Sequence, residues 1–104
     1  MVTSYYRYVG DAEKKSIDSG GTIQSKSGLT WFTPDRYDSK ADAKKYLALS
    51  SLPEWRIGPV ASDEMPDFDK VALRPVAPTN GEPGGGVECA TSRPVYLFQM
   101  VRLS

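Results

Sequence analysis

Three consecutive glycines, at residues 84–86, constrain this chain more than any other feature of its sequence. Glycine has no side chain to bury, so we expect the run to serve the backbone, which can adopt angles that other residues avoid and lets a partner approach closely. The preceding loop begins at Pro78 and contains Asn80-Gly81 and Pro83, which favour tight, exposed turns. Residues 87–91 then have the composition of a short strand. The sequence therefore predicts an exposed loop that leads directly into a strand.

Glu88 lies at the start of this expected strand, next to the glycine loop. A carboxylate fixed on a strand beside a flexible loop is a typical arrangement for a catalytic group with a mobile lid. The alternative interpretation is a hairpin turn whose glutamate faces solvent.

Composition narrows the chemistry that such a site can use. The chain has 104 residues, which indicates one domain, and its 13 basic residues balance its 13 acidic residues. Without a basic excess or a long apolar run, we expect no nucleic-acid partner and no membrane partner. The chain has no histidine, which excludes histidine bases and most zinc sites. We expect no metal, and we expect the single cysteine, Cys89, to be a buried strand residue.

The hydrophobic pattern predicts an α+β domain that spans residues 1–104. Expected strands lie at 4–9, 29–33, 55–60, 71–76, 87–91 and 94–101, with a strand fragment at 22–24. Expected helices lie at 11–18 and from residue 38 or 39 to about 49. Residues 94–101 are apolar on both faces, which favours a central strand. This order predicts two small, mostly antiparallel sheets packed together, with two short helices at one side.

Two of the expected strands carry candidate binding residues. Arg7 lies in the middle of an aromatic strand, where an anion would satisfy its planar fork, although an edge arginine in water is the alternative. Trp31 and Phe32 are neighbours in a strand, so they face opposite sides. One can fill the core while the other offers a flat ring to a ligand, and the alternative is that both belong to the core.

Three short motifs, in this order, resemble those of a known enzyme family. They are Tyr6-Arg7, the run Thr30-Trp31-Phe32-Thr33, and Glu88 after the turn-rich loop. The trio resembles the ADP-ribosyltransferase toxins, in the branch with an arginine on the first strand. The run from YYRYVG through SGGTI and LTWFTPDRY to PGGGVE is most similar to toxin domains at the C-termini of bacterial rearrangement-hotspot (Rhs) proteins. The resemblance implies a split β-sandwich with NAD, the substrate, in the cleft between the sheets.

The resemblance also implies roles for individual residues. Arg7, with Tyr6 beside it, would hold the phosphates and the adjoining ribose of NAD, and Glu88 would be the catalytic carboxylate. Thr30 and Thr33 would brace the site, and Trp31 or Phe32, with Tyr37 as a second ring, would lie near the nicotinamide. The loop would meet the acceptor through Asn80, Glu82, Gly84, Gly85 and Gly86. Arginine-modifying members often carry Glu or Gln two positions before the catalytic glutamate, where this chain has Gly86, and Glu82 is the candidate substitute.

The function expected from the resemblance is an antibacterial toxin. It would transfer ADP-ribose from NAD to a protein of a rival bacterium, with elongation factor Tu as the first candidate, and so block translation. It would reach the target cytoplasm as the tip of a larger secreted effector, for example by type VI secretion, and a cognate immunity protein would neutralise it. Two alternatives stay open: an NAD glycohydrolase on the same scaffold, and a non-enzymatic β-rich binding module.

Overall fold

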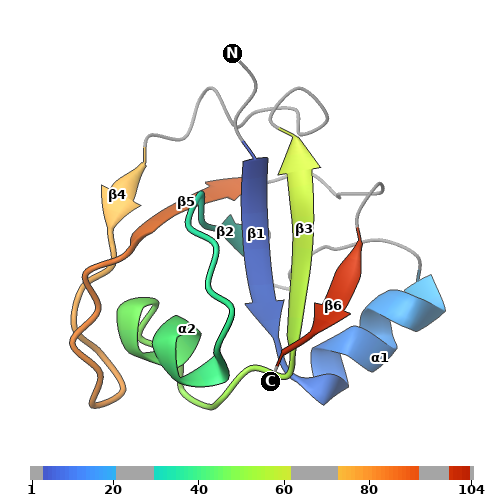
Figure 1. Ribbon diagram of the computed structural model, residues 1–104, viewed down its shortest axis with the longest axis horizontal. Coiled ribbons are helices and arrows are strands. Elements are labelled where there is room, and N and C mark those ends of the chain that lie inside the picture. Colours follow the sequence, from blue (N-terminus) through green and yellow to red (C-terminus); the bar gives the residue numbers. More distant parts are fainter. Residues whose placement is uncertain (1–3, 21–29, 62–72, 92–98, 104) are drawn as a thin grey trace.

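The described part of the chain folds into two three-stranded antiparallel sheets and two helices (Figure 1). The computed structural model describes residues 4–20, 30–61, 73–91 and 99–103. Within these residues, no helix is long and apolar enough to cross a membrane. The elements follow the chain in this order: β1 (Ser4–Val9), α1 (Asp11–Gly20), β2 (Thr30–Phe32), α2 (Lys40–Tyr46), β3 (Trp55–Ala61), β4 (Arg74–Pro75), β5 (Val87–Thr91) and β6 (Met100–Arg102).

The first sheet has the order β1-β3-β6, with β3 in the middle. The aromatic and β-branched residues of β1 and β3 suit a pleated surface that is buried on one face. That face packs against α1 and the second sheet, and its core consists of Tyr5, Val9, Ile17, Phe32, Ile57, Val60 and Cys89. The main hydrophobic core therefore lies between the two sheets.

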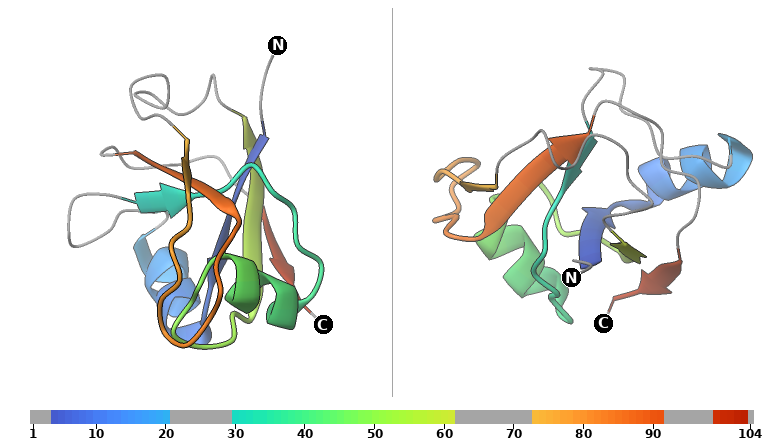
Figure 2. Two further views of the ribbon diagram at one scale, coloured as in Figure 1. Left: turned by 90° about the vertical axis from the view of Figure 1, so that its left-hand side faces the viewer. Right: turned by 90° about the horizontal axis from the view of Figure 1, so that it is seen from above.

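The second sheet has the order β2-β5-β4. A backbone bridge joins the two sheets: the Tyr6 amide donates to the Thr33 carbonyl at 2.7 Å, and the Thr33 amide donates to the Tyr6 carbonyl at 2.8 Å. Pro34 follows and cannot donate to a ladder, so the pairing stops there. From this bridge the sheets diverge, and β5 runs across the direction of β1 and β3 (Figures 1 and 2).

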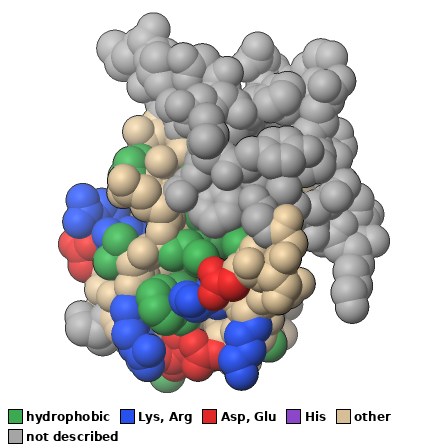
Figure 3. All heavy atoms as spheres, turned by 90° about the vertical axis from the view of Figure 1, so that its right-hand side faces the viewer, with side chains coloured by type: hydrophobic (Ala, Val, Ile, Leu, Met, Phe, Trp, Pro, Cys, Tyr) green, Lys and Arg blue, Asp and Glu red, His purple; other side chains and the backbone are tan. Residues whose placement is uncertain are grey.

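Helix α1 is attached to the first sheet through Trp55. The indole Nε1 donates to Asp11 at 2.9 Å, and the Lys14 ammonium and the Arg102 guanidinium lie 4.5 and 5.5 Å from the ring centre. On the described part of the face formed by α1 and β6, basic and acidic side chains mix with hydrophobic ones (Figure 3). The only buried residue of this helix is Ile17, so α1 rests on the domain with a narrow apolar face.

Helix α2 lies beside the loop that links β4 to β5 (Figure 2). Ser39 caps its start, because the Ser39 hydroxyl accepts from the Asp42 amide at 3.1 Å. The helix ends at Tyr46, and Ala48 adopts a left-handed conformation with φ of 51°. The Asn80 side-chain amide donates to the Ala48 carbonyl at 2.9 Å, so the loop is attached to the end of α2 and does not stand free as expected of a lid.

The structure confirms the α+β class and the order of the elements, and it corrects several of their ends. The second helix stops three residues before its expected end at Leu49. The expected strand at 71–76 is reduced to Arg74–Pro75 in the described residues. The expected central strand at 94–101 appears as β6, which pairs with β3 at one end of the sheet order. The expected strand fragment at 22–24, and residues 94–98, lie outside the described residues.

Candidate functional site

A recess opens where the two sheets part at the Tyr6–Thr33 bridge. Its volume is about 70 Å³. Side chains from β1, from β2, from the end of α2 and from β5 surround it. Its lining consists of Tyr6, Arg7, Tyr8, Trp31, Phe32, Thr33, Leu47, Leu49 and Glu88. The recess thus joins residues from both sheets that are far apart in the sequence.

Arg7 is held at the edge of this recess by two partners. Its Nε and Nη2 atoms donate to the two carboxylate oxygens of Glu13, at 2.7 and 2.8 Å. Its Nη1 atom donates to the Trp31 carbonyl at 2.9 Å. A guanidinium has five N–H donors, so these contacts engage three of them. The expected anionic partner of Arg7 is therefore present, and it is a carboxylate of the chain itself.

Glu88 lies on β5, opposite Arg74 of β4. The Arg74 Nε atom donates to Glu88 Oε1 at 3.1 Å, and the Arg74 guanidinium lies 4.3 Å from the centre of the Trp31 ring. Because Trp31 pairs with Ala90, two residues beyond Glu88, Trp31 and Glu88 share one face of the sheet. The carboxylate and the indole are thus placed together on that face.

The register of β2 and β5 also shows which aromatic residue of β2 belongs to the core. Phe32 pairs with Cys89, and both are buried in the main core. Trp31 faces the other way and is only half-buried. Of the two candidates, Trp31 is therefore the ring outside the core, and the opposite orientations of the two rings agree with the alternation expected of successive strand positions.

A second hollow adjoins the recess at Arg7. Its volume is about 240 Å³, and it shares Arg7, Tyr8 and Leu49 with the recess. The rest of its lining is Val9, Gly10, Glu13, Ser50, Ser51 and Pro53. Arg7 therefore lies between two hollows, one with a mostly apolar lining and the other with a mostly polar one, and Glu13 lines the polar one.

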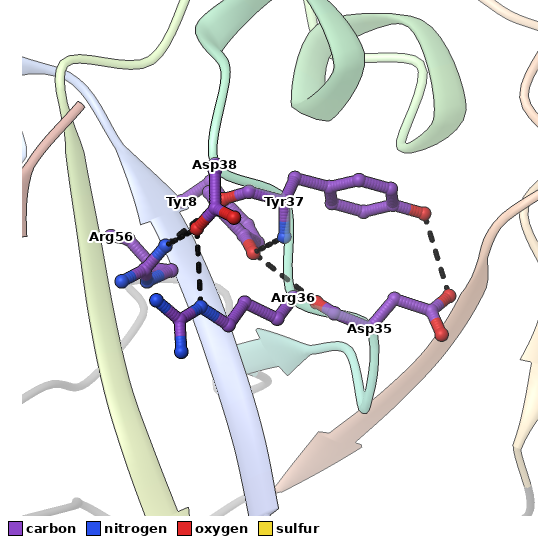
Figure 4. A network of polar contacts seen from close by, with 6 residues as sticks. All are labelled: Tyr8, Asp35, Arg36, Tyr37, Asp38 and Arg56. Atoms are coloured by element: carbon purple, nitrogen blue, oxygen red, sulfur yellow. Dashed lines mark hydrogen bonds and ion pairs between the residues drawn. The ribbon is translucent and has the colours of Figure 1, made fainter. Parts of the chain in front are cut away.

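A network of polar contacts fixes the segment that follows β2 (Figure 4). The Tyr8 hydroxyl donates to the Asp35 carbonyl at 3.2 Å and accepts from the Tyr37 amide at 2.5 Å. Buried Arg56 donates from Nη1 to Asp38 at 2.8 Å and to the Tyr37 carbonyl at 3.2 Å. Burial raises the pKa of Tyr8 to about 12, and the hydrogen bond from Arg56 lowers the pKa of Asp38.

Tyr37, which this network holds, does not line the recess. Its ring stacks on Tyr46, with centroids 5.6 Å apart and planes at 16°. Tyr37 belongs to a second hydrophobic cluster, built on Tyr8, Ala43 and Leu103. Tyr37 was expected to lie near the nicotinamide as a second ring, but in this structure it is not part of the lining of the recess.

The glycine run has a packing explanation that the sequence did not reveal. Gly84 has φ of +69°, and a Cβ atom there would lie 2.5 Å from the Val76 carbonyl oxygen. A Cβ atom on Gly86 would lie 2.9 Å from both the Tyr37 hydroxyl and the Tyr46 carbonyl oxygen. The Gly84 and Gly86 amides donate to the carbonyls of Lys45 and Tyr46, at 3.1 and 3.0 Å. Gly84 thus allows the two limbs of the loop to approach each other closely, and Gly86 allows the loop to pack closely on α2.

The structure brings six of the predicted site residues into the recess and leaves the others outside its lining. The six are Tyr6, Arg7, Trp31, Phe32, Thr33 and Glu88. Thr30 is buried beside them in β2. The predicted acceptor-loop residues contact α2 or face solvent near it: Asn80, Glu82, Gly84, Gly85 and Gly86.

Sequence reasoning missed five residues that shape the site. Tyr8, Leu47 and Leu49 line the recess, Glu13 holds Arg7, and Arg74 pairs with Glu88. Glu13 carries no distinctive signal, because an acidic residue is favourable in the first turn of any helix. Arg74 was detectable only by pairing the strands on either side of the loop in the correct register.

The single cysteine is buried, as its place in a strand predicted. Cys89 is buried in the main core, and this burial, with a smaller effect of Glu88, raises the pKa of its thiol to about 12. A buried thiol of this kind is inert at neutral pH. Among the described residues, no group of three or more Cys, Asp and Glu side chains is placed to hold a metal ion.

Comparison with known proteins gave no significant match, whether to family models, to curated proteins or to solved structures.

Proposed function

We propose that this protein is a mono-ADP-ribosyltransferase that uses NAD as its substrate and has the split β-sandwich of that family. One observation carries the proposal: Arg7 and Glu88, predicted as the phosphate-binding and catalytic residues, line the same recess together with Trp31. These residues come from three strands of two sheets, and the resemblance used only their order along the chain. Their meeting at the place where the sheets part is what the proposed function requires.

The chemistry of the recess suits the breaking of a glycosidic bond. When nicotinamide leaves, its bond to the ribosyl carbon breaks and positive charge develops on the ribose. A fixed carboxylate such as Glu88 stabilises this charge more than it stabilises the ground state. A nucleophile of the acceptor then forms the new bond to that carbon and loses a proton. No histidine takes part, which agrees with a chain that has none.

The size of the hollows is consistent with one end of NAD in the recess. At about 70 Å³ the recess is smaller than the roughly 300–1,000 Å³ of typical ligand pockets, so it can admit only part of a dinucleotide. We infer that the nicotinamide end enters the recess against Trp31. The diphosphate would lie at Arg7, and the rest of the molecule would extend toward the hollow of about 240 Å³.

A second candidate function is an NAD glycohydrolase, in which water is the acceptor. The observation that favours it is the position of the proposed acceptor loop, whose residues Asn80, Gly84 and Gly86 are engaged with α2. A loop used in this way has fewer groups left to recognise a protein acceptor. Both candidates need Glu88, and they differ only in what receives the ADP-ribose.

The experiment that tests the proposal combines the purified protein with biotin-labelled NAD and a bacterial lysate, followed by blotting. We expect one labelled band, and a loss of about 10²–10³-fold in NAD turnover in Glu88→Gln. The fold should survive, because Arg74 is largely exposed and an exposed ion pair contributes less than about 1 kcal/mol. Glu54→Gln removes a similar part-buried carboxylate, paired with Lys40, and should leave turnover unchanged.

The other outcomes discriminate between the candidates. NAD loss without a labelled band would favour the glycohydrolase. A chain that folds but consumes no NAD would contradict both enzymes and leave the non-enzymatic binding module. A band near the size of elongation factor Tu would support the proposed target. We further propose, on the resemblance, delivery as the tip of a larger effector and neutralisation by an immunity protein that covers the recess.

A further inference from the structure

The ion pair of Arg7 and Glu13 occupies the atoms that an anionic ligand would use. A guanidinium holds a carboxylate or a phosphate best through two parallel N–H donors. On Arg7 the Nε–Nη2 pair of donors is already taken by both oxygens of Glu13, at 2.7 and 2.8 Å. Only two N–H donors are left, one on Nη1 and one on Nη2, since Trp31 accepts the other from Nη1.

The charges around the recess also disfavour the binding of an anion in this state. Among the described residues at the recess, Arg7 is paired with Glu13 and Arg74 is paired with Glu88, so both of these cations have a carboxylate partner. In this state these two pairs offer an incoming anion no net positive charge. A diphosphate that approached Arg7 would also meet the carboxylate of Glu13 at hydrogen-bonding distance from the same guanidinium, and like charges so placed repel.

We propose that Glu13 competes with the anionic ligand for Arg7 and thereby limits how tightly the site holds a diphosphate. This inference rests on the proposed function only for the assumption that Arg7 binds the diphosphate. Glu13 must release the Nε–Nη2 donors before a diphosphate can take them. The release is feasible because the Glu13 side chain is 37% exposed and lies on α1, so rotation of the side chain moves its carboxylate into water.

The test measures binding of inorganic pyrophosphate by titration calorimetry, in the absence of NAD. Glu13→Gln keeps the size of the side chain and removes its charge, so we expect pyrophosphate to bind about tenfold tighter than to the wild type. Glu13→Ala should also bind more tightly. Arg7→Gln in the Glu13→Gln background should abolish the gain, since the guanidinium is then missing.

Asp18→Asn is the matched control. Asp18 lies on the same helix and pairs with Lys14, so its substitution changes the charge of α1 equally without touching Arg7. We expect wild-type affinity for pyrophosphate in this variant. If a Glu13 variant is less stable, the rise in its melting temperature with pyrophosphate, measured against Asp18→Asn, reports the same affinity difference.

Equal or weaker binding of pyrophosphate in Glu13→Gln would overturn the inference, since it would mean that Glu13 supports the site. A gain matched by Asp18→Asn would also overturn it, since general charge would then explain the effect. NAD turnover by the wild type is assayed separately. Turnover that depends on Glu88, without tighter binding in Glu13→Gln, would leave the proposed function standing and remove only the competition.

Discussion

Arg7 joins three elements of the fold, and it is also the cation at the edge of the recess. It lies on β1, pairs with Glu13 of α1 and donates to the Trp31 carbonyl of β2. Its side chain is 20% exposed, so these charge-assisted hydrogen bonds are partly shielded from water. An arginine on an apolar strand therefore has a structural role here, besides the ligand-binding role that we propose for it.

We predict that Arg7→Ala lowers the free energy of unfolding by roughly 1.5–3 kcal/mol, the range for hydrogen bonds to charged groups. Arg7→Lys should lower the free energy of unfolding by less, because lysine keeps the charge, although it lacks the paired donors. Urea unfolding at neutral pH measures both. Arg36→Ala is the control, because its pair with Asp38 is largely exposed and should contribute less than about 0.5 kcal/mol. Equal losses in Arg7→Ala and Arg36→Ala would show that Arg7 does not connect the elements.

At the scale of the elements, the local sequence predicted which helices and strands form, and contacts between residues distant in the sequence decided where some of them end. The strands at residues 4–9 and 87–91 followed directly from their composition, and both have the expected bounds. Helix α2 could not be delimited in this way. Its end depends on Ala48, which leaves the helical conformation and is held by Asn80, 32 residues further along the chain.

In the candidate site, too, some features were predictable from the local sequence and others depended on distant contacts. The opposite orientations of Trp31 and Phe32 follow from the period of a strand and were predictable. The meeting of Arg7 with Glu88 was implied only by the resemblance, since it depends on the bridge that joins the two sheets. The partner Glu13 could not be predicted, because which carboxylate reaches which cation is decided by the packed structure, and Arg74 could be found only from the register of β4 and β5.

The glycine loop supplies a prediction at the scale of the element. Gly84→Ala should destabilise the protein by more than the roughly 1–2 kcal/mol that a left-handed residue costs, because its Cβ atom would also meet the Val76 carbonyl oxygen at 2.5 Å. Gly85 and Gly81 have φ of +99° and +75°, but a Cβ atom in Gly85→Ala or Gly81→Ala would meet only open space. They should show the strain alone.

Urea unfolding of the three alanine variants separates these two contributions. A loss in Gly84→Ala that is at least about 1 kcal/mol greater than in the other two would confirm that the loop packs on its neighbours. Equal losses in all three would indicate that only backbone angles matter and that Gly84 does not pack against the Val76 carbonyl.

At the scale of the whole molecule, both hydrophobic clusters contain side chains that ionise only at alkaline pH, a thiol in one and two tyrosine hydroxyls in the other. Burial raises the pKa of Cys89 in the main core from 9.0 to about 12. In the second cluster, burial raises the pKa values of Tyr8 and Tyr37 from 10.0 to about 12, with Asp35 as a further cause for Tyr37. Each of these groups is neutral in the folded protein at a pH where the unfolded chain ionises.

These shifts predict that the protein loses stability at alkaline pH before its buried groups ionise. Each folded pKa lies above the unfolded value, so between the two values the folded state binds more protons, and the free energy of unfolding falls as pH rises. The fall should begin near pH 9 with Cys89, steepen near pH 10 with the tyrosines, and end near pH 12. Buried Cys89 and Tyr8 each contribute a slope that approaches about 1.4 kcal/mol per pH unit, and the partly exposed Tyr37 contributes less because solvent screens it. Cys89→Ala should therefore flatten the urea-unfolding profile between pH 9 and 10 and reduce, without removing, the fall between pH 10 and 12, where the tyrosines also contribute. Parallel profiles for the two proteins would contradict the burial of the thiol.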